Sequence, residues 1–432
     1  MSDVSMPSAS PSPSLPSASS SSSVEVRTET THPSPRLGRV GPVMFLAHFG
    51  WLLPAAAGAT LIQALLTRID AEAKLALYAT LSTVGAVGAT LANVAFGVLS
   101  DRTRSRYGRR NPWIVGGGLA AAASLSAMSL VRDFATLVAL WMVFQIALNA
   151  FLGPLIAILP DRVSAADLGK ASSCVGAGQL VAQSVAGIVA GLFLAVPAEG
   201  LRWIPWLLAA GALLVFFLLP DRSNRHEPRE PLALAALLRN LLPPRDADFA
   251  WALVGRFLGM LSLFLVLMYQ LYTLTDYLGL GTSDAAKAIA TGGVVMAVAS
   301  GAAIALAGPL SDRLGRRKVF VAASSLLMGA AALPLALTPS LWAFHAFLAV
   351  GGFGFGAYLA VDQALIAEVL PSQAHAAKDM GILNIANTAP QIVAPVIAVV
   401  IVPGLGFRGL FLLATGCAVA GALCVKPIRR VR

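Results

Sequence analysis

GVLSDRTRSRYGRR (Gly97–Arg110) and GPLSDRLGRR (Gly308–Arg317) are two versions of one charged cassette in an otherwise apolar chain. Each version follows one long hydrophobic segment and precedes another. An arginine-rich turn that recurs at matching places indicates two related halves, each with a turn at a membrane surface.

The composition supports a membrane protein. The 432 residues are 57% hydrophobic and only 12% charged, whereas soluble domains are about 25% charged. About 20 apolar residues cross a bilayer as a helix. We therefore predict twelve spans: Val43–Leu66, Ala76–Leu99, Trp113–Val131, Phe134–Leu159, Ser172–Val196, Trp203–Leu219, Ala250–Thr275, Ala288–Leu310, Val319–Thr338, Leu341–Ala367, Ile382–Val402 and Phe407–Val425.

The halves repeat outside the cassettes as well, because Leu155–Gln183 is similar to Leu365–Pro395. The predicted fold is therefore an all-α membrane protein of two pseudo-symmetric six-helix bundles, with a central cavity and alternating access. The expected regions are a disordered Ser/Pro-rich tail (1–40), a first bundle (41–220), a linker with a short surface helix over Leu232–Leu242 (221–249), a second bundle (250–427) and a basic tail (428–432).

The basic residues are strongly sided. With a cytoplasmic amino terminus, 24 of the 31 Lys and Arg residues fall inside and six fall outside. This bias predicts a multi-pass protein of the cell membrane with both termini in the cytoplasm, and it accounts for the net charge of +10 without a nucleic-acid partner. Arg256 is the remaining basic residue, and we expect it to reach from the seventh span toward the cytoplasm.

The second cassette matches the loop motif of the major facilitator superfamily, which the chain resembles from Val43 to Val425. The longer first cassette and HFGWLL (His48–Leu53) are similar to the glycoside–cation and sucrose symporters of that superfamily. Gly153–Pro154 followed by Asp161 also resembles their fourth helix. The chain has Ile156 where sucrose carriers place an arginine, so disaccharide specificity does not carry over.

The resemblance implies that the cassettes form a conformational latch on the cytoplasmic face. A carboxylate there can accept from free helix-end amides or pair with an arginine of the turn. The alternative is that these charges only set the topology. The expected latch residues are Gly97, Asp101, Arg102, Gly108, Arg109, Arg110, Asp161, Gly308, Asp312, Arg313, Gly315, Arg316, Arg317 and Glu368.

Amide and aromatic side chains within the spans suit a neutral, hydroxyl-rich solute, because amides pair with hydroxyls and rings stack on sugars. The alternative is hydrogen bonding between helices. The predicted substrate-binding residues are His48, Trp51, Gln145, Asn149, Gln179, Tyr269, Gln270, Tyr272, Asn384, Asn387 and Gln391; Gln63, Gln183 and Gln363 are further polar candidates.

Asp362 lies about two turns inside the tenth span. A carboxylate in the membrane is costly, so it should face a cavity, a partner or a proton. Asp362 is therefore the candidate for ion coupling, with structural pairing as the alternative. His48 is a weaker proton candidate.

No Walker motif, metal-ligand spacing or catalytic cluster is present, so we expect no cofactor, no metal site and no enzyme activity. The leading prediction is a monomeric transporter that couples a sugar or glycoside to an ion, preferably a proton. The alternative is a proton-driven exporter of a drug or secondary metabolite, since one fold serves both directions.

Overall fold

The computed structural model describes residues 37–429 except 165–166, 222, 226–245 and 370–375. The side chains at 37, 94, 160, 168–169, 312, 363–385 and 387 also lie outside the described part. The described residues form helices joined by short turns. The expected surface helix over Leu232–Leu242 falls outside this part of the chain.

The N-terminal half contains six spans. Its helices are α1 (Leu37–Ile69), α2 (Lys74–Arg102), α3 (Asn111–Ala127), η1 (Met128–Leu130), α4 (Phe134–Arg162), α5 (Leu168–Phe193), α6 (Pro197–Trp203) and α7 (Trp206–Leu218). The sixth span combines α6 and α7, so it starts at Pro197 rather than at the predicted Trp203. Asp133 caps α4 by accepting from the Thr136 amide at 2.8 Å, and this hydrogen bond lowers the pKa of Asp133.

The C-terminal half contains two irregular spans. Its helices are α9 (Ala247–Leu267), α10 (Gln270–Tyr272), η2 (Thr273–Tyr277), α11 (Thr282–Leu314), α12 (Arg317–Leu337), α13 (Leu341–Ala346), η3 (Phe347–Gly351), α14 (Gly352–Val369) and α15 (Ala376–Cys424). The seventh span breaks after α9 and continues through α10 into η2, a π-helical turn. The tenth span contains a second π-helical turn, η3. Such turns are rare and often lie at functional sites.

The last two spans are joined in α15. Eleven helices of the described part are long and apolar enough to cross a membrane, and the last of them, Thr388–Cys424, is long enough for two spans. Gly406, with φ 65° and ψ −174°, divides it. The predicted all-helical fold is therefore confirmed, and the described helices account for twelve spans whose bounds differ from the predicted ones.

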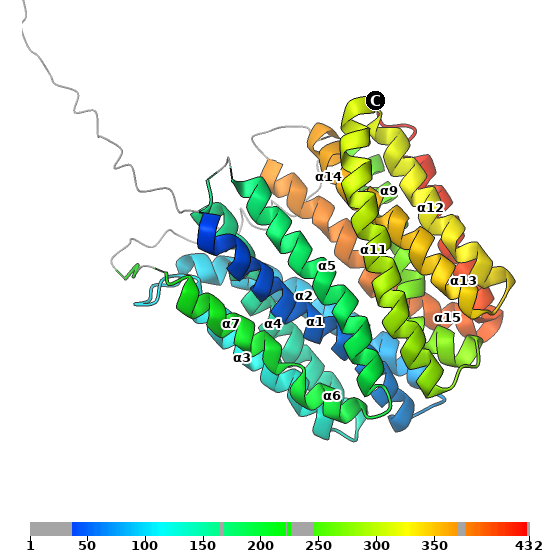
Figure 1. Cartoon of the computed structure of the whole chain (residues 1–432), viewed down its shortest axis with the longest axis horizontal. Coiled ribbons are helices and arrows are strands. Elements are labelled where there is room, and N and C mark those ends of the chain that lie inside the picture. Colours follow the sequence, from blue (N-terminus) through cyan, green and yellow to red (C-terminus); the bar gives the residue numbers. More distant parts are fainter. Residues whose placement is uncertain (1–36, 165–166, 222, 226–245, 370–375, 430–432) are drawn as a thin grey trace, which may run out of the picture. The chain divides into compact units, whose positions relative to one another are not determined.

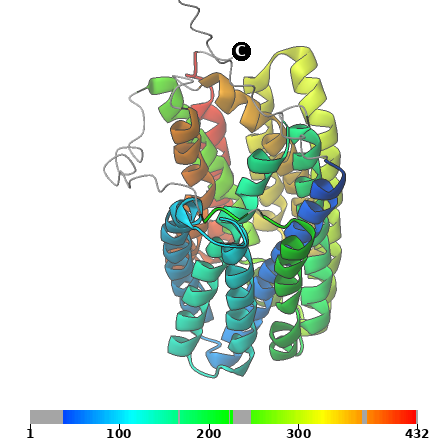
Figure 2. The ribbon, with the colours of Figure 1, turned by 90° about the vertical axis from the view of Figure 1, so that its left-hand side faces the viewer.

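The two halves pack in corresponding ways (Figure 1). In the N-terminal half, α1 packs on α5 and α7, while α3 packs on α4 and α7; in the C-terminal half, α9 and α12 both pack on α15. The most extensive contacts between the halves are α5 with α11 and α2 with α15, and α1 also contacts α10. Figure 2 shows the long helices running roughly along one direction. Most of the interface is thus built from the second and fifth spans of one half and from α11 and α15 of the other, and the first and seventh spans add a smaller contact.

Glycine allows the closest approach between the halves. A Cβ atom at Gly187 of α5 would lie 2.9 Å from the Ile289 carbonyl oxygen and 3.4 Å from the Gly293 Cα of α11. A Cβ at Gly191 would lie 2.7 Å from the Ala286 carbonyl oxygen. The backbones of α5 and α11 therefore meet directly along this part of the interface.

The ends of the helical region differ slightly from the predicted boundaries. Helix α1 begins at Leu37, within the stretch that we assigned to the tail. At the other end, Ile428 is buried and its carbonyl oxygen accepts from the Lys318 ammonium, while the Arg429 amide donates to both carboxylate oxygens of Asp248 at 3.1 Å. Residues 428 and 429 therefore belong to the folded C-terminal half rather than to a tail.

Candidate functional site

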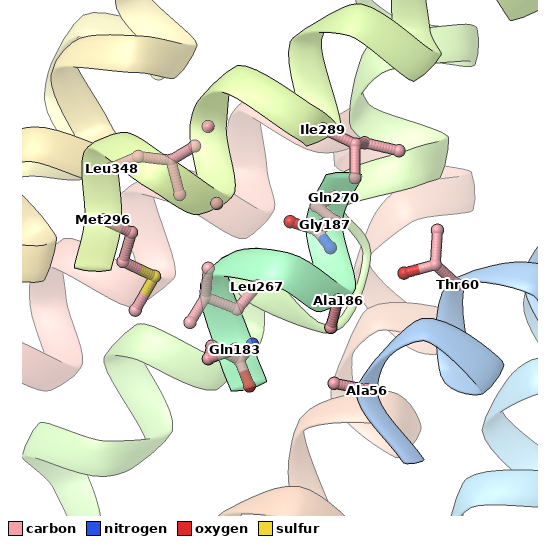
Figure 3. Close-up of a pocket in the computed structure, with 12 residues that line it drawn as sticks. Ala56, Thr60, Gln183, Ala186, Gly187, Leu267, Gln270, Ile289, Met296 and Leu348 are labelled. Carbon is pink, nitrogen blue, oxygen red and sulfur yellow. The ribbon is translucent and has the colours of Figure 1, made fainter. Parts of the chain in front are cut away.

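A cavity of about 90 Å³ lies between the two halves (Figure 3). Ala56 and Thr60 extend from α1 on one side, and Met296 and Leu348 lie on the opposite side. The remaining lining residues come from α5, α9, α10 and α11: Gln183, Ala186, Gly187, Leu267, Gln270, Ile289, Gly292 and Gly293. The cavity is smaller than the roughly 300–1,000 Å³ of most ligand pockets, so it is narrow in this state.

The chemistry of the cavity is neutral. Its polar side chains are the hydroxyl of Thr60 and the amides of Gln183 and Gln270, and none of the residues that line it is charged. Hydroxyl and amide groups both donate and accept hydrogen bonds, while the leucine, isoleucine and methionine side chains supply apolar contact. The arrangement can therefore hold a small neutral group with both polar and apolar parts.

Beyond one end of the cavity, α1 and α2 close against the broken seventh span. We call this contact the tyrosine gate and define it as Gln63, Lys74, Tyr78, Tyr269, Tyr272 and Asp276. The Gln63 Nε2 donates to the Met268 carbonyl at 2.8 Å, and the Tyr272 hydroxyl donates to the Gln63 carbonyl at 3.1 Å. Each of these bonds joins the N-terminal half to the C-terminal half.

Aromatic and ionic contacts complete the tyrosine gate. The Tyr78 ring meets the rings of Tyr269 and Tyr272 edge-on, with centroids 5.4 and 6.2 Å apart. The Lys74 ammonium lies 2.7 Å from the Asp276 carboxylate and 5.1 Å from the centre of the Tyr272 ring. All three tyrosines are buried. This end of the interface is therefore shut by packing as well as by hydrogen bonds.

The first cassette forms a network that we call the arginine cluster, defined as Asp101, Arg109, Arg110, Asp161, Arg162 and Asp221. The Arg110 guanidinium lies 2.7 Å from Asp101 and 3.1 Å from Asp161, and it donates to the Ser100 hydroxyl at 2.7 Å. Arg109 lies 2.8 Å from Asp161. Arg162 lies 3.2 Å from Asp221. These pairs tie together the end of α2, the start of α3, the end of α4 and the segment after α7.

Gly108 permits the turn that carries the arginine cluster. Its φ of 82° is in the left-handed region, and a Cβ there would come within 2.2 Å of the Asp221 side chain. Asn224 holds the same turn, because its side chain accepts from the Ser105 amide at 3.0 Å and donates to the Thr103 carbonyl at 2.8 Å. The glycine is thus needed for both backbone conformation and space.

The second cassette ends α11 at Leu314, and Gly315 follows as a left-handed cap with φ 59°. Its amide donates to the Ser311 carbonyl at 2.9 Å. Arg313 and Arg316 are exposed, and Arg317 is half-buried at the start of α12. The side chains of Asp312 and Glu368 lie outside the described residues. The latch itself stays a prediction; in the described part, the pairs of the first cassette are contacts within the N-terminal half.

Asp362 has a partner in the interior of the C-terminal half. Its Oδ2 lies 3.1 Å from the Arg256 Nη1, and only 4% and 2% of the two side chains are exposed. Tyr358 is also buried and lies one helical turn before Asp362 on α14. The expectation that Arg256 reaches the cytoplasm is wrong, because a buried carboxylate on α14 stabilises the guanidinium inside the protein. Ion coupling by Asp362 stays a prediction.

The predicted substrate-binding residues divide into separate groups. Gln270 lines the cavity, whereas Tyr269 and Tyr272 belong to the tyrosine gate. The His48 Nδ1 lies 2.8 Å from the Met44 carbonyl oxygen of the same helix, and the His48 ring lies edge-on to Trp51. Asn149 accepts from the Asn93 amide at 3.2 Å and donates to the Gln145 carbonyl at 2.9 Å, so it joins α2 to α4. This contact matches the helix-pairing alternative.

Gln145, Gln179 and Gln391 are not among the residues that line the cavity. Gln145 and Gln179 are half-buried, and Gln391 is exposed. The side chains of Asn384, Asn387 and Gln363 lie outside the described residues. Sequence reasoning missed Thr60, although its spacing of four residues from Ala56 places both on one face of α1. It also missed the Lys74–Asp276 pair, whose two members come from different halves.

Comparison with known proteins identifies the fold. The family model described as "Major Facilitator Superfamily" matches residues 40–305 and 288–432. Comparison with curated protein sequences gives no match. A variant of the nucleoside transporter NupG has a similar structure, with a TM-score of 0.71 and 13% identity over 90% of this chain and 99% of that one.

Two further solved structures are similar over most of their length. A POT family transporter in complex with a thioalcohol-conjugated peptide gives a TM-score of 0.69 at 14% identity, covering 90% of this chain and 95% of that one. The human organic anion transporter MFSD10 gives 0.61 at 18% identity, covering 90% and 99%. These proteins have different cargoes, so the likeness concerns the fold.

Proposed function

Because the chain belongs to the Major Facilitator Superfamily, it is a membrane transporter, and we propose that it carries a small neutral polar solute, with a sugar or glycoside as the preferred class. The carrying observation is the cavity between the halves, whose polar groups are uncharged. A charged solute held there would lack a countercharge among the lining side chains, and burying an unpaired charge is costly. A hydroxyl-rich solute would match Thr60, Gln183 and Gln270.

The transport cycle that we propose is alternating access. The tyrosine gate closes one end of the interface, and the parallel repeats would rock about the cavity to open it. With both termini in the cytoplasm, the tyrosine gate faces outward and the arginine cluster faces inward. In this cycle the two cassettes act as the latch, because their contacts differ between the two states of a monomer.

A proton is the preferred coupling ion in this proposal. Asp362 is the buried carboxylate that would take it up, and Arg256 is the group that balances its charge when the proton leaves. Loading and release of the proton would therefore alter one ion pair inside the C-terminal half.

Export of a drug or secondary metabolite is the second candidate. Much of the cavity lining is apolar, including Leu267, Ile289, Met296 and Leu348. The chain also has Ile156, 56% exposed, in place of the arginine of the sucrose carriers. Both observations suit a more lipophilic solute.

Transport by the purified full chain in liposomes distinguishes these candidates. A panel of radiolabelled neutral sugars and glycosides, lipophilic cations and organic anions would be tested for exchange and for accumulation driven by a pH gradient. We expect the neutral hydroxylated solutes to be transported and the variants Gln183→Leu and Gln270→Leu to raise KM. Thr90→Val is the control, since Thr90 is exposed and bonds its own helix at Ala86. Transport of lipophilic cations alone would establish the export candidate instead.

A further inference from the structure

Gln63 is the side chain that crosses between the halves directly beside the cavity. It lies three and seven residues beyond Thr60 and Ala56, so the three residues share one face of α1. Thr60 and Ala56 line the cavity, while Gln63 is 3% exposed and donates to the Met268 carbonyl at 2.8 Å. Helix α1 therefore supplies both one wall of the cavity and a contact to the opposite half.

The Met268 carbonyl is placed by the break in the seventh span. Helix α9 ends at Leu267, and Tyr269 has φ −113° and ψ 20°, outside the helical region. Carbonyls at a helix end lack intrahelical donors, and at membrane depth they need a partner from elsewhere in the protein. The Gln63 amide is such a partner for Met268. Its hydrogen bond thus stabilises the broken conformation.

The break decides where Gln270 lies. Gln270 begins α10 two residues after Met268, and its side chain lines the cavity. Tyr272, on the same short helix, returns a hydrogen bond to the Gln63 carbonyl at 3.1 Å. Gln63 therefore contacts the residues on either side of Gln270. Its side chain bonds Met268, and its backbone carbonyl accepts from Tyr272.

We propose that Gln63 is a positioning residue for solute binding, which holds the break of the seventh span so that Gln270 faces the cavity. This inference deepens the proposed function and rests on it only for the identity of the solute. Opening of the tyrosine gate breaks the Gln63–Met268 bond, releases the segment 268–272 and turns Gln270 away from the solute. The Gln63 side chain amide thus links the affinity for the solute to the opening of the tyrosine gate.

The first experiment uses transport at symmetric pH, measured as exchange by the full chain in liposomes. Gln63→Met keeps the length of the side chain but loses the donor, and loss of one interhelical hydrogen bond predicts a rise in KM of about 3- to 20-fold with little change in Vmax. Gln63→Glu has a donor only when its carboxyl is protonated. We compare the KM of each variant with that of the parent protein at the same pH. This ratio should approach one for Gln63→Glu as pH falls, and it should stay raised for Gln63→Met.

Tyr272→Phe is the matched control for the other bond of the segment. It removes the hydroxyl that donates to the Gln63 carbonyl but leaves the Gln63 amide intact. We expect a smaller rise in KM than for Gln63→Met. An unchanged KM in Gln63→Met with normal insertion, or equal behaviour of Gln63→Glu and Gln63→Met at all pH values, would overturn the proposal.

The second experiment needs no solute, so it separates this inference from the proposed function. A single cysteine at Gln270→Cys, in a protein with Cys174, Cys417 and Cys424 replaced by serine, is labelled with N-ethylmaleimide in the presence and absence of Gln63→Met. We expect the labelling rate at position 270 to change about 3- to 20-fold, while the rate for a cysteine at exposed Thr90 stays constant. Equal rates at position 270 would show that Gln63 does not position Gln270.

Discussion

The Arg256 guanidinium and the Asp362 carboxylate, on α9 and α14, form a buried ion pair at 3.1 Å in the C-terminal half. The pair joins the seventh span to the tenth, and the buried Tyr358 lies one helical turn before Asp362 on α14. Removing one member of a buried pair leaves the other uncompensated, whereas replacing both with apolar residues can be neutral. This difference gives the ion pair a characteristic response to mutation.

We predict that Arg256→Met and Asp362→Leu each destabilise the protein by about 3–5 kcal/mol, and that the double variant recovers most of this loss. Thermal unfolding of the detergent-purified protein, followed by its monodisperse fraction, measures the effect. Arg202→Gln is the control, because the Arg202–Glu199 pair is about half exposed and should contribute at most about 1 kcal/mol. A double variant as unstable as the worse single variant would contradict the pairing.

The coupling role of Asp362 makes a separate prediction. Asp362→Asn mimics the protonated carboxyl, so it should retain exchange of preloaded solute but lose accumulation driven by a pH gradient. A proton crossing a potential of 100 mV supplies about 2.3 kcal/mol, or nearly fifty-fold accumulation. The measurement is uptake with and without the gradient, with Glu199→Gln as a surface control.

Three results would be informative for Asp362→Asn. Retained accumulation would remove Asp362 from coupling, and loss of exchange as well would indicate a binding or structural role. If Asp362→Asn is unstable because Arg256 is left without its partner, the double variant Arg256→Met/Asp362→Asn removes this cause. If it folds well and exchanges solute without accumulating it, the coupling role is supported.

Within the arginine cluster, we predict that Arg110→Met is more harmful than Asp101→Ala. The Arg110 side chain is 9% exposed and contacts two carboxylates, so losing its charged hydrogen bonds should cost about 1.5–3 kcal/mol. Asp101 is 57% exposed, which limits its contribution to about 1 kcal/mol. Thermal stability ranks the two variants, and Arg106→Met, at an exposed position, is the control.

Asp101→Ala also tests the latch. If Asp101 holds the cytoplasmic face shut in one state, the variant should insert normally, shift toward the inward-facing state and cycle more slowly. Labelling of single cysteines on the two sides of the cavity reports the shift. Unchanged labelling together with normal transport would leave only a topological role for these charges.

Because α5 and α11 pack closely, we predict that one added methyl group between them alters the opening of the tyrosine gate. Gly187→Ala places a Cβ 2.9 Å from the Ile289 carbonyl oxygen, so it should push the helices apart at a cost of about 1–3 kcal/mol. We expect the population to move toward the state with an open tyrosine gate, seen as faster labelling of a cysteine at Lys74. Gly176→Ala on the same helix is the matched control, because nothing lies within 4 Å of its Cβ position. Equal labelling in the two variants would argue against this contact as part of the gate.

The sidedness of the charges predicts the orientation. Alkaline phosphatase fused after Arg202 should be active outside the cytoplasm, and the same enzyme fused after Arg245 should be inactive. The reverse pattern would turn the tyrosine gate toward the cytoplasm and contradict the latch assignment.

Much of the fold could be predicted because it depends on local patterns. Apolar stretches of sufficient length marked the spans, and the two cassettes marked the symmetry between the halves. Gly108 and Gly315 were expected in turns, and both have positive φ. Each of these features can be read from a short window of the chain.

The partners of buried side chains could not be predicted in the same way. Arg256 and Asp362 lie on helices far apart in the sequence, so the Arg256 position alone suggested a route to the membrane surface. Asn149 has the amide side chain that we expected of a binding residue, yet this amide joins α2 to α4. The break after Leu267 has no proline or glycine to mark it, and Gln63, from another half, stabilises it.

Gly406 is the only residue with non-helical backbone angles inside α15, and its φ and ψ lie in a region that is essentially restricted to glycine. The eleventh and twelfth spans therefore turn about a single pivot with no separate loop between them, although Pro403, Gly404 and Leu405 beside the pivot are exposed. A tag inserted at this connection would separate two helices that follow each other directly. For labelling or crystallisation aids, the Asp70–Ala73 turn between α1 and α2 is the better place on this face.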